Sequence, residues 1–208
     1  MKNILIHGLG QISKDWDTIK NELETRGISS VAPDLFDLAK GRKLDYPTVY
    51  QAFSELCESY QDKLNLCGLS LGGLLALNYA IQYPKKINSL VLIGTPFEIP
   101  KGLLKFQNIV FRFMPKAVFQ NMGVSKKDFI RLSKSMVDLN FMDSATALDC
   151  PALILCGAKD KTNMESAKRF HEAMKNSKLV IVEASGHEVN KDNPNESVRV
   201  LQDFWADR

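Results

Sequence analysis

Short runs dominated by apolar residues recur along the chain, and polar positions rarely interrupt them. Such runs are typical of strands that are buried on both faces, as in a parallel sheet. The runs are Ile4–Ile6, Ile28–Ala32, Leu64–Cys67, Leu90–Ile93, Ala152–Cys156 and Leu179–Val182. The pattern therefore predicts a sheet of about six strands.

Stretches with helical period separate several of these runs. Their apolar residues recur every three or four positions, as in a helix that covers one face of a sheet. The apolar positions are Trp16, Ile19 and Leu23; Val49, Phe53, Leu56 and Tyr60; Ala167, Phe170 and Met174; and Val198, Leu201 and Phe204. Alternating strands and helices form right-handed crossovers. We expect an α/β fold with helices on both faces of the sheet, in a single domain over residues 1–208.

One segment departs from this alternation. More than fifty residues separate the strand that ends before Gly94 from the strand that begins at Ala152, far more than one crossover helix requires. Apolar positions in this segment again have helical spacing, including Leu103, Phe106 and Val110. We predict a helical cap inserted at about residues 97–148.

Composition narrows the class of protein. The chain is 45% hydrophobic with a formal net charge of +3, and its basic residues are interspersed with acids, so no nucleic-acid-binding surface is expected. No run approaches the ~18 apolar residues of a membrane span, and we expect a soluble, cytoplasmic protein. The cysteines show no C-x-x-C pairing or metal-ligand spacing. Neither metal nor cofactor is expected, and the oligomeric state is left open.

The residues Gly68-Leu69-Ser70-Leu71-Gly72 form a G-x-S-x-G motif. An apolar strand precedes the motif and an apolar helix is expected to follow it. A strand-to-helix turn this tight holds its central residue in a strained conformation with the side chain exposed above the sheet. The motif therefore predicts that Ser70 is a nucleophile.

With the motif in this setting, the chain resembles the α/β-hydrolase superfamily over nearly its full length outside the cap. The segments that carry the resemblance, besides the motif, are His7-Gly8-Leu9-Gly10, Tyr83-Pro84, Leu90 to Pro96, Cys150 to Asp160, and Gly186-His187. The order Ser, Asp, His along the chain is also that of the superfamily. The resemblance implies a catalytic triad of Ser70, Asp160 and His187, with the loop after His7 contributing to an oxyanion hole.

The chemistry requires these residue types. A serine hydroxyl becomes a useful nucleophile when a base takes its proton, and His187 is the expected base. A carboxylate on the far ring nitrogen, here from Asp160, fixes the imidazole tautomer. The backbone N–H groups of Leu9 and Leu71 are the expected oxyanion donors.

Alternatives remain for several polar residues. The acid of this superfamily can follow an earlier strand, which leaves Asp138 and Asp143 as rivals to Asp160. Glu188, beside the expected base, is interpreted as a supporting or solvated residue. His7 is interpreted as a brace for the oxyanion loop.

The predicted activity is that of a carboxylesterase that cleaves small or medium acyl esters. A thioesterase, a lipase-like enzyme or a C–C bond hydrolase would use the same triad, and a non-catalytic small-molecule-binding module is the rival from another class. The cap is rich in phenylalanine, so one face of each cap helix could line an acyl site or anchor the cap. Its outer face is rich in lysine and arginine and is expected to face solvent. Contact with an anionic membrane or an acidic leaving group is the alternative.

Overall fold

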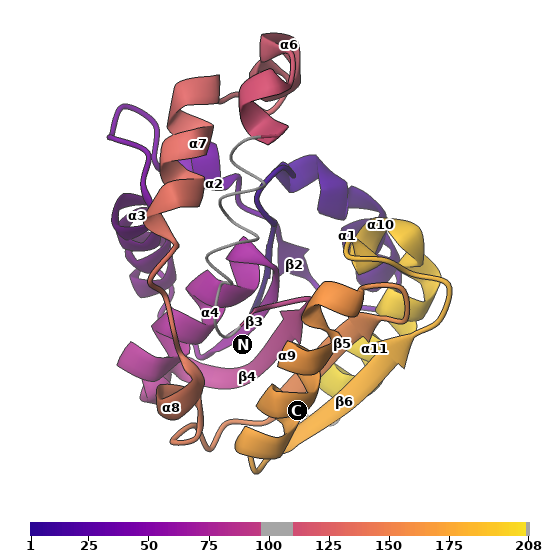
Figure 1. Ribbon diagram of the computed structural model, residues 1–208. Coiled ribbons are helices and arrows are strands. Elements are labelled where there is room, and N and C mark those ends of the chain that lie inside the picture. The colour runs from indigo at the N-terminus through magenta and orange to yellow at the C-terminus, as the bar shows by residue number, and fades with distance from the viewer. Residues whose placement is uncertain (97–109, 207–208) are drawn as a thin grey trace.

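The computed structural model describes residues 1–96 and 110–206, and its centre is a parallel sheet (Figure 1). The strands are β1 (Lys2–Ile6), β2 (Ser30–Val31), β3 (Leu64–Leu69), β4 (Ile87–Ile93), β5 (Ala152–Gly157) and β6 (Ser177–Val182). Within the described residues the sheet has six strands in the order β2-β1-β3-β4-β5-β6, and every pair is parallel. The expectation of a parallel sheet of about six strands is confirmed.

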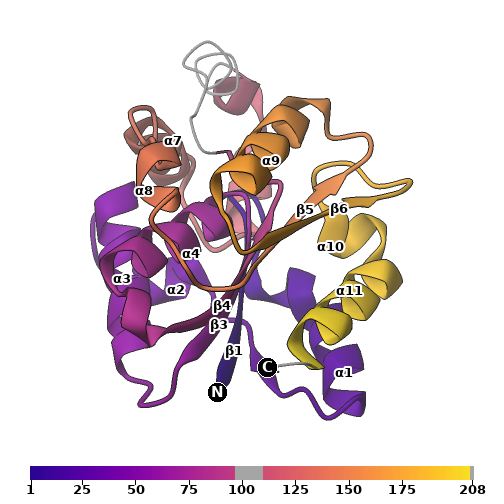
Figure 2. The ribbon, with the colours of Figure 1, turned by 90° about the horizontal axis from the view of Figure 1, so that it is seen from below.

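Helices cover both faces of the sheet. On one face lie the short 3₁₀-helix η1 (Ser13–Trp16) and helices α1 (Asp17–Thr25), α10 (Val189–Asp192) and α11 (Pro194–Ala206). On the other lie α2 (Leu35–Leu38), α3 (Tyr46–Glu58), α4 (Leu71–Gln82) and α9 (Lys161–Ala173), and the 3₁₀-helix η2 (Pro84–Lys86) connects α4 to β4. Figure 2 shows the two groups on opposite sides of the strands.

The alternation of side chains along each strand divides the core into two clusters. In β4, Leu90 and Leu92 pack on the side of α4, whereas Val91 and Ile93 pack on the side of α1 and α11. Successive strand residues point to opposite faces, so an uninterrupted apolar strand supplies both clusters. This explains why the sequence shows continuous apolar runs rather than an apolar–polar alternation.

The edge strand β2 is shorter than its apolar run predicts. The run Ile28–Ala32 is expected to be a strand, but only Ser30 and Val31 pair with β1. Pro33 comes directly after the run Ile28–Ala32, and it has no N–H group to donate to a ladder. Ile28 and Ala32 still pack, half-buried, against the core, so their apolar character reflects burial rather than strand pairing.

The segment between β4 and β5 contains the short helices α6 (Lys116–Gln120), α7 (Lys126–Ser135) and α8 (Met142–Ala145). The side chain of Ser125 caps α7 by accepting a hydrogen bond from the Asp128 N–H group at 3.1 Å. At the other end of α7, the Ser135 hydroxyl accepts a hydrogen bond from the Tyr46 N–H group at 2.7 Å, which ties α7 to the start of α3. The predicted helical positions Leu103 and Phe106 lie outside the described residues.

Aromatic rings hold the cap together. The ring of Phe129 packs against those of Phe111 and Phe119, with centroids 5.0 Å apart in each pair. Phe119 and Phe129 belong to the same buried cluster as α4, so these rings anchor the cap. Phe113 differs, because its side chain is 84% exposed. Val110, at helical spacing from Phe113, is also exposed, at 42%.

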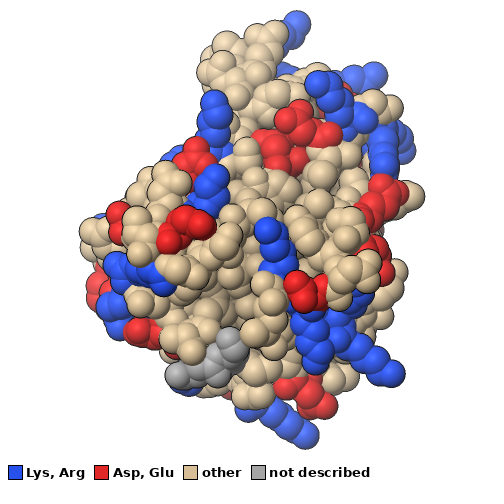
Figure 3. All heavy atoms as spheres, turned by 180° about the vertical axis from the view of Figure 1, so that it is seen from behind, with Lys and Arg blue, Asp and Glu red and all other residues tan. Residues whose placement is uncertain are grey.

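The charged side chains are spread over the molecule. Figure 3 shows lysine and arginine interspersed with acids over one whole face, as the small net charge of +3 implies. Two of the basic side chains of the cap are bonded to other groups of the same segment. Lys126 donates to the carbonyl oxygen of Met114 at 2.8 Å, and Arg131 forms an ion pair with Asp128 at 2.7 Å.

Candidate active site

Ser70 occupies the turn between β3 and α4 in a strained backbone conformation. Its φ of 52° and ψ of −110° lie in a region that residues with a Cβ rarely adopt. Its N–H group donates to the Ile93 carbonyl oxygen at 2.9 Å, and its side chain makes no capping bond to α4. The turn therefore holds the backbone of Ser70 and leaves its hydroxyl out of the helix cap.

Close approaches explain why glycines surround this serine. A Cβ atom at Gly68 would lie 2.2 Å from the carbonyl carbon of Gly72, and one at Gly72 would lie 2.2 Å from the carbonyl oxygen of Ile6. A Cβ at Gly73 would lie 1.9 Å from the hydroxyl oxygen of Thr95. Since real Cβ atoms do not approach other atoms this closely, the tight turn requires glycine at all of these positions.

Asp160 and His187 form a hydrogen-bonded pair. Asp160 follows β5 and His187 lies in the loop between β6 and α10; His187 Nδ1 is 2.7 Å from Asp160 Oδ2. The Asp160 side chain is only 5% exposed, whereas that of His187 is 41% exposed. A buried carboxylate thus holds one ring nitrogen while the imidazole remains accessible.

Asn163 is a further partner of the acid. Its side-chain amide donates to Asp160 Oδ1 at 3.0 Å and to Oδ2 at 2.9 Å. Burial acts to raise the pKa of Asp160, but hydrogen bonds from His187 and Asn163 and the charge of His187 outweigh it, so the pKa is lowered from its ordinary value. Asn163 is not among the candidate residues named above from the sequence. Its spacing of three residues from Asp160, at the start of a helix, is the signal that could have identified it.

The end of β4 connects this pair to the serine turn. Gly94 directly follows Ile93, whose carbonyl oxygen binds the N–H group of Ser70. Gly94 has φ of +50°, and a Cβ there would lie 3.0 Å from His187 Nδ1 and 3.2 Å from Asp160 Oδ2. The loops that carry Ser70, Asp160 and His187 therefore converge at the carboxyl ends of β3, β4, β5 and β6.

The loop after β1 lies next to the same turn. A Cβ at Gly8 would be 3.5 Å from the Cβ of Ser70. Leu9 is a corner of the tight turn that the Gln11 N–H group closes by donating to the Gly8 carbonyl oxygen at 3.2 Å. Leu71 is the first residue of α4, where N–H groups have no partner within the helix. Both expected oxyanion donors thus lie next to the serine turn, Leu9 in the loop after β1 and Leu71 at the start of α4.

His7 is buried beneath this loop. Its Nδ1 atom donates to the Gly8 carbonyl oxygen at 2.9 Å, and its Nε2 atom accepts from the Leu35 N–H group at 2.9 Å. Burial lowers the pKa of His7 below its ordinary value, although its hydrogen bond to Gly8 and the charges of Asp34 and Asp15 act in the opposite direction. A neutral His7 therefore connects the loop to α2.

Comparison with known proteins identifies the family. The model of the alpha/beta hydrolase fold family matches residues 4–139. The chain belongs to the α/β-hydrolase fold family. A second model, described as TAP-like protein, matches residues 138–205 of this hydrolase-fold chain.

Individual relatives are more distant. Lipase 3 of Moraxella sp. (strain TA144) is 26% identical over 238 residues, covering 93% of this chain and 75% of the lipase. An uncharacterized protein of Mycobacterium tuberculosis is 32% identical over 117 residues, which are 52% of this chain and only 32% of that protein. The chain thus covers only about a third of the length of that relative, through about half of its own residues.

Solved structures share the fold at low sequence identity. A carboxylesterase of the thaumarchaeon Nitrososphaera gargenis superimposes with a TM-score of 0.85 at 19% identity, over 99% of this chain and 89% of the other. An esterase from Thermogutta terrifontis gives a TM-score of 0.82 at 18% identity, over 100% of this chain and 90% of the other. The expected fold is confirmed.

The rival acids lie elsewhere. Asp138 and Asp143 are exposed on the cap segment. Glu188 accepts a hydrogen bond from the side-chain amide of Gln11 at 2.9 Å and pairs with Lys191 at 3.4 Å. Of these carboxylates, only that of Asp160 is bonded to His187.

Residues 1–96 and 110–206 contain no group of His, Cys, Asp and Glu side chains arranged for a metal ion. The four cysteines are free thiols, and burial raises the pKa of Cys156 to about 11, which disfavours its thiolate. In the same part of the chain, no helix has both the length and the apolar character that a membrane crossing demands.

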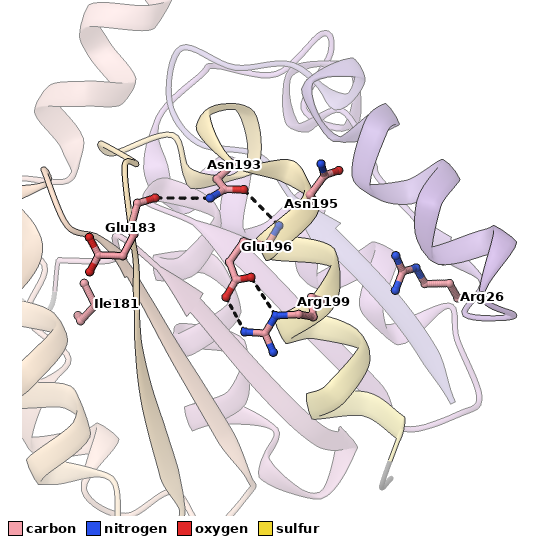
Figure 4. Close-up of a pocket in the computed structure, with 7 residues that line it drawn as sticks. All are labelled: Arg26, Ile181, Glu183, Asn193, Asn195, Glu196 and Arg199. Carbon is pink, nitrogen blue, oxygen red and sulfur yellow. Dashed lines mark hydrogen bonds and ion pairs between the residues drawn. The ribbon is translucent and has the colours of Figure 1, made fainter.

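A surface hollow lies between β6, α11 and the end of α1 (Figure 4). Its lining includes Glu183, Glu196 and Arg199, and the last two form an ion pair with each other. None of Ser70, Asp160 and His187 lines it. We therefore do not assign the hollow to the candidate active site.

Proposed function

We propose that the chain is a serine hydrolase that cleaves small or medium acyl esters through an acyl-Ser70 intermediate. The observation that carries the proposal is the Asp160–His187 hydrogen bond of 2.7 Å, which lies against Gly94 next to the strand end that binds Ser70. The similarity to proteins named lipase and esterase supports ester hydrolysis as the class of reaction.

In the acylation step, the Ser70 oxygen attacks the ester carbonyl carbon while His187 Nε2 takes the hydroxyl proton. The hydrogen bond from Nδ1–H to Asp160 fixes this tautomer and stabilises the imidazolium that forms. The carbonyl oxygen becomes an oxyanion, and the N–H groups of Leu9 and Leu71 are its proposed donors. When the intermediate collapses, the alcohol leaves with the proton from His187.

Deacylation repeats these roles with water as the nucleophile. His187 takes a proton from water, the hydroxide attacks the acyl carbon, and Ser70 leaves as the protonated alcohol when His187 returns the proton. The carboxylic acid is then released. Every proton in this cycle is transferred by His187, so no cofactor is needed.

The proposal is tested by hydrolysis of a series of p-nitrophenyl esters of increasing acyl length. We expect an initial burst of p-nitrophenol, as for a covalent intermediate, and a loss of about 10⁴-fold or more in kcat for Ser70→Ala. Ser29→Ala is the matched control, because Ser29 is exposed and lies before β2 at the opposite end of the sheet.

The outcomes separate the alternatives. Rates that peak at short or medium acyl chains support the proposed substrate class, whereas a peak at long chains favours a lipase-like enzyme. Stoichiometric labelling by a phosphonate without turnover of any ester would favour a binding module. Equal activity of Ser70→Ala and the wild type would contradict the proposal.

A further inference from the structure

Gln11 closes the turn that carries the proposed oxyanion donor Leu9. Its side chain is buried, with 1% exposure of the residue. Its Oε1 atom accepts a hydrogen bond from the Gly8 N–H group at 3.3 Å, while its own backbone N–H group donates to the Gly8 carbonyl oxygen at 3.2 Å. Both the main chain and the side chain of Gln11 therefore hold this turn.

The same side chain reaches the segment that carries the proposed base. Its Nε2 atom donates to Glu188 Oε1 at 2.9 Å and to Asn190 Oδ1 at 3.1 Å. An amide NH₂ group has two hydrogens to donate, and here both are used. Glu188 is the residue directly after His187, so one amide bridges the neighbour of Leu9 and the neighbour of the base.

Further contacts link the two segments around this bridge. Asn190 Nδ2 donates to the Asp15 carbonyl oxygen at 3.1 Å. Lys191 lies 3.5 Å from the carboxylate of Asp15 and 3.4 Å from that of Glu188. Asp15 also accepts a hydrogen bond from the Ile12 N–H group at 2.8 Å. The two amides at the centre of this network, Gln11 and Asn190, are each 1% exposed. Buried polar groups with satisfied partners favour one arrangement of the groups they join.

We propose that Gln11 is a positioning residue that sets the oxyanion turn and the His187 loop relative to each other. This inference rests on the proposed function, since it concerns the alignment of Leu9 N–H with the imidazole. The side chain of Gln11 bonds Gly8, Glu188 and Asn190. Its loss therefore displaces the groups that stabilise the transition state more than it weakens substrate binding. Small misplacements of catalytic groups lower the rate by about 10²-fold.

The test is Gln11→Glu, which preserves size and the acceptor for Gly8 but removes both amide hydrogens and places a carboxylate beside Glu188. We expect kcat for a p-nitrophenyl ester to fall by about 10- to 100-fold, with KM within about threefold. Gln61→Glu, at an exposed glutamine, makes the same charge change and should leave both constants unchanged.

A double variant supplies the rescue. Gln11→Glu combined with Glu188→Gln restores a donor and an acceptor across the bridge, with their roles exchanged. We expect kcat to recover by about tenfold over Gln11→Glu alone, because residues in contact show coupling energies of this size. A structural role alone would lower the melting temperature without this recovery in kcat.

The results distinguish the inference from the function on which it rests. An active wild type with an equally active, folded Gln11→Glu variant overturns the inference and leaves the proposed function intact. A loss in Gln11→Glu that appears in KM with kcat unchanged also overturns it. A wild type that hydrolyses no ester and does not react with a phosphonate contradicts the proposed function, and the inference fails with it.

Discussion

The Nδ1 atom of His187 lies 2.7 Å from Oδ2 of Asp160, although 27 positions separate the two residues in the sequence. The carboxylate is nearly buried and also accepts two hydrogen bonds from the amide of Asn163. It is therefore held as an anion that accepts the Nδ1–H of the imidazole. In the proposed mechanism, Nε2 is then the nitrogen that takes the proton from Ser70.

The assignment of the acid predicts a specific mutational pattern. Asp160→Asn should lower kcat by about 10³- to 10⁴-fold, because an amide next to Nδ1 favours the wrong imidazole tautomer. Asp138→Asn and Asp143→Asn are the matched controls and should stay within about twofold of the wild type, as exposed sites usually do. Steady-state kinetics on an activated ester measure all three. Retained activity in Asp160→Asn, with loss in either control, would move the acid to the cap segment.

A second prediction concerns the loop that carries His187. A Cβ at Gly157 would lie 2.0 Å from the Gly186 carbonyl oxygen and 2.5 Å from that of Ser185, so Gly157→Ala must displace the loop. We expect kcat to fall by about tenfold or more, together with a lower melting temperature in differential scanning fluorimetry.

Gly41→Ala is the comparison for Gly157→Ala. Gly41 has φ of +78° and no atom within 4 Å of an added Cβ, so that variant adds backbone strain without a clash. It should lose stability but keep the activity of each folded molecule. Unchanged kcat in Gly157→Ala would show that the His187 loop does not need this close approach.

Burial of His7 makes stability depend on pH. Its pKa in the folded chain is lowered by burial, whereas an unfolded histidine has a pKa of about 6.5. The unfolded chain therefore binds the proton more readily. The contribution of His7 is full above pH ~6.5 and is lost as pH falls from there through the folded pKa.

Urea unfolding between pH 5 and pH 8 measures this effect. The free energy of unfolding should fall below pH ~6.5, and the fall should be smaller in His7→Gln, which has no proton to gain. The difference between the two proteins isolates His7 from the other histidines. Parallel pH profiles would contradict the buried, neutral state of His7.

The elements of the sheet could be predicted because their signals are local. The apolar run Leu64–Cys67 predicts a strand from its own residues, and the strand β3 extends it to Leu69. The glycines at 68, 72 and 73 indicate the tight turn because each removes a Cβ that would clash. The last helix also has a local start signal, since the side chain of Asn193, just before α11, accepts a hydrogen bond from the Glu196 N–H group at 3.2 Å.

Contacts between distant segments could not be predicted in the same way. The bonds from Gln11 to Glu188 and Asn190 span 177 and 179 positions, and no periodicity in either segment indicates them. The exposure of Phe113 is a similar case, because helical spacing identifies an apolar face but not the surface that covers it. The sequence thus predicts individual elements, whereas these contacts depend on how the elements pack.

The most direct test of the central claim is to find the atom that a serine-reactive phosphonate modifies. The protein is treated with a fluorophosphonate, digested, and analysed by mass spectrometry. We predict one adduct, on Ser70, absent from Ser70→Ala and formed far more slowly in His187→Ala. No adduct, an adduct on another residue, or an equal rate in His187→Ala would contradict the account.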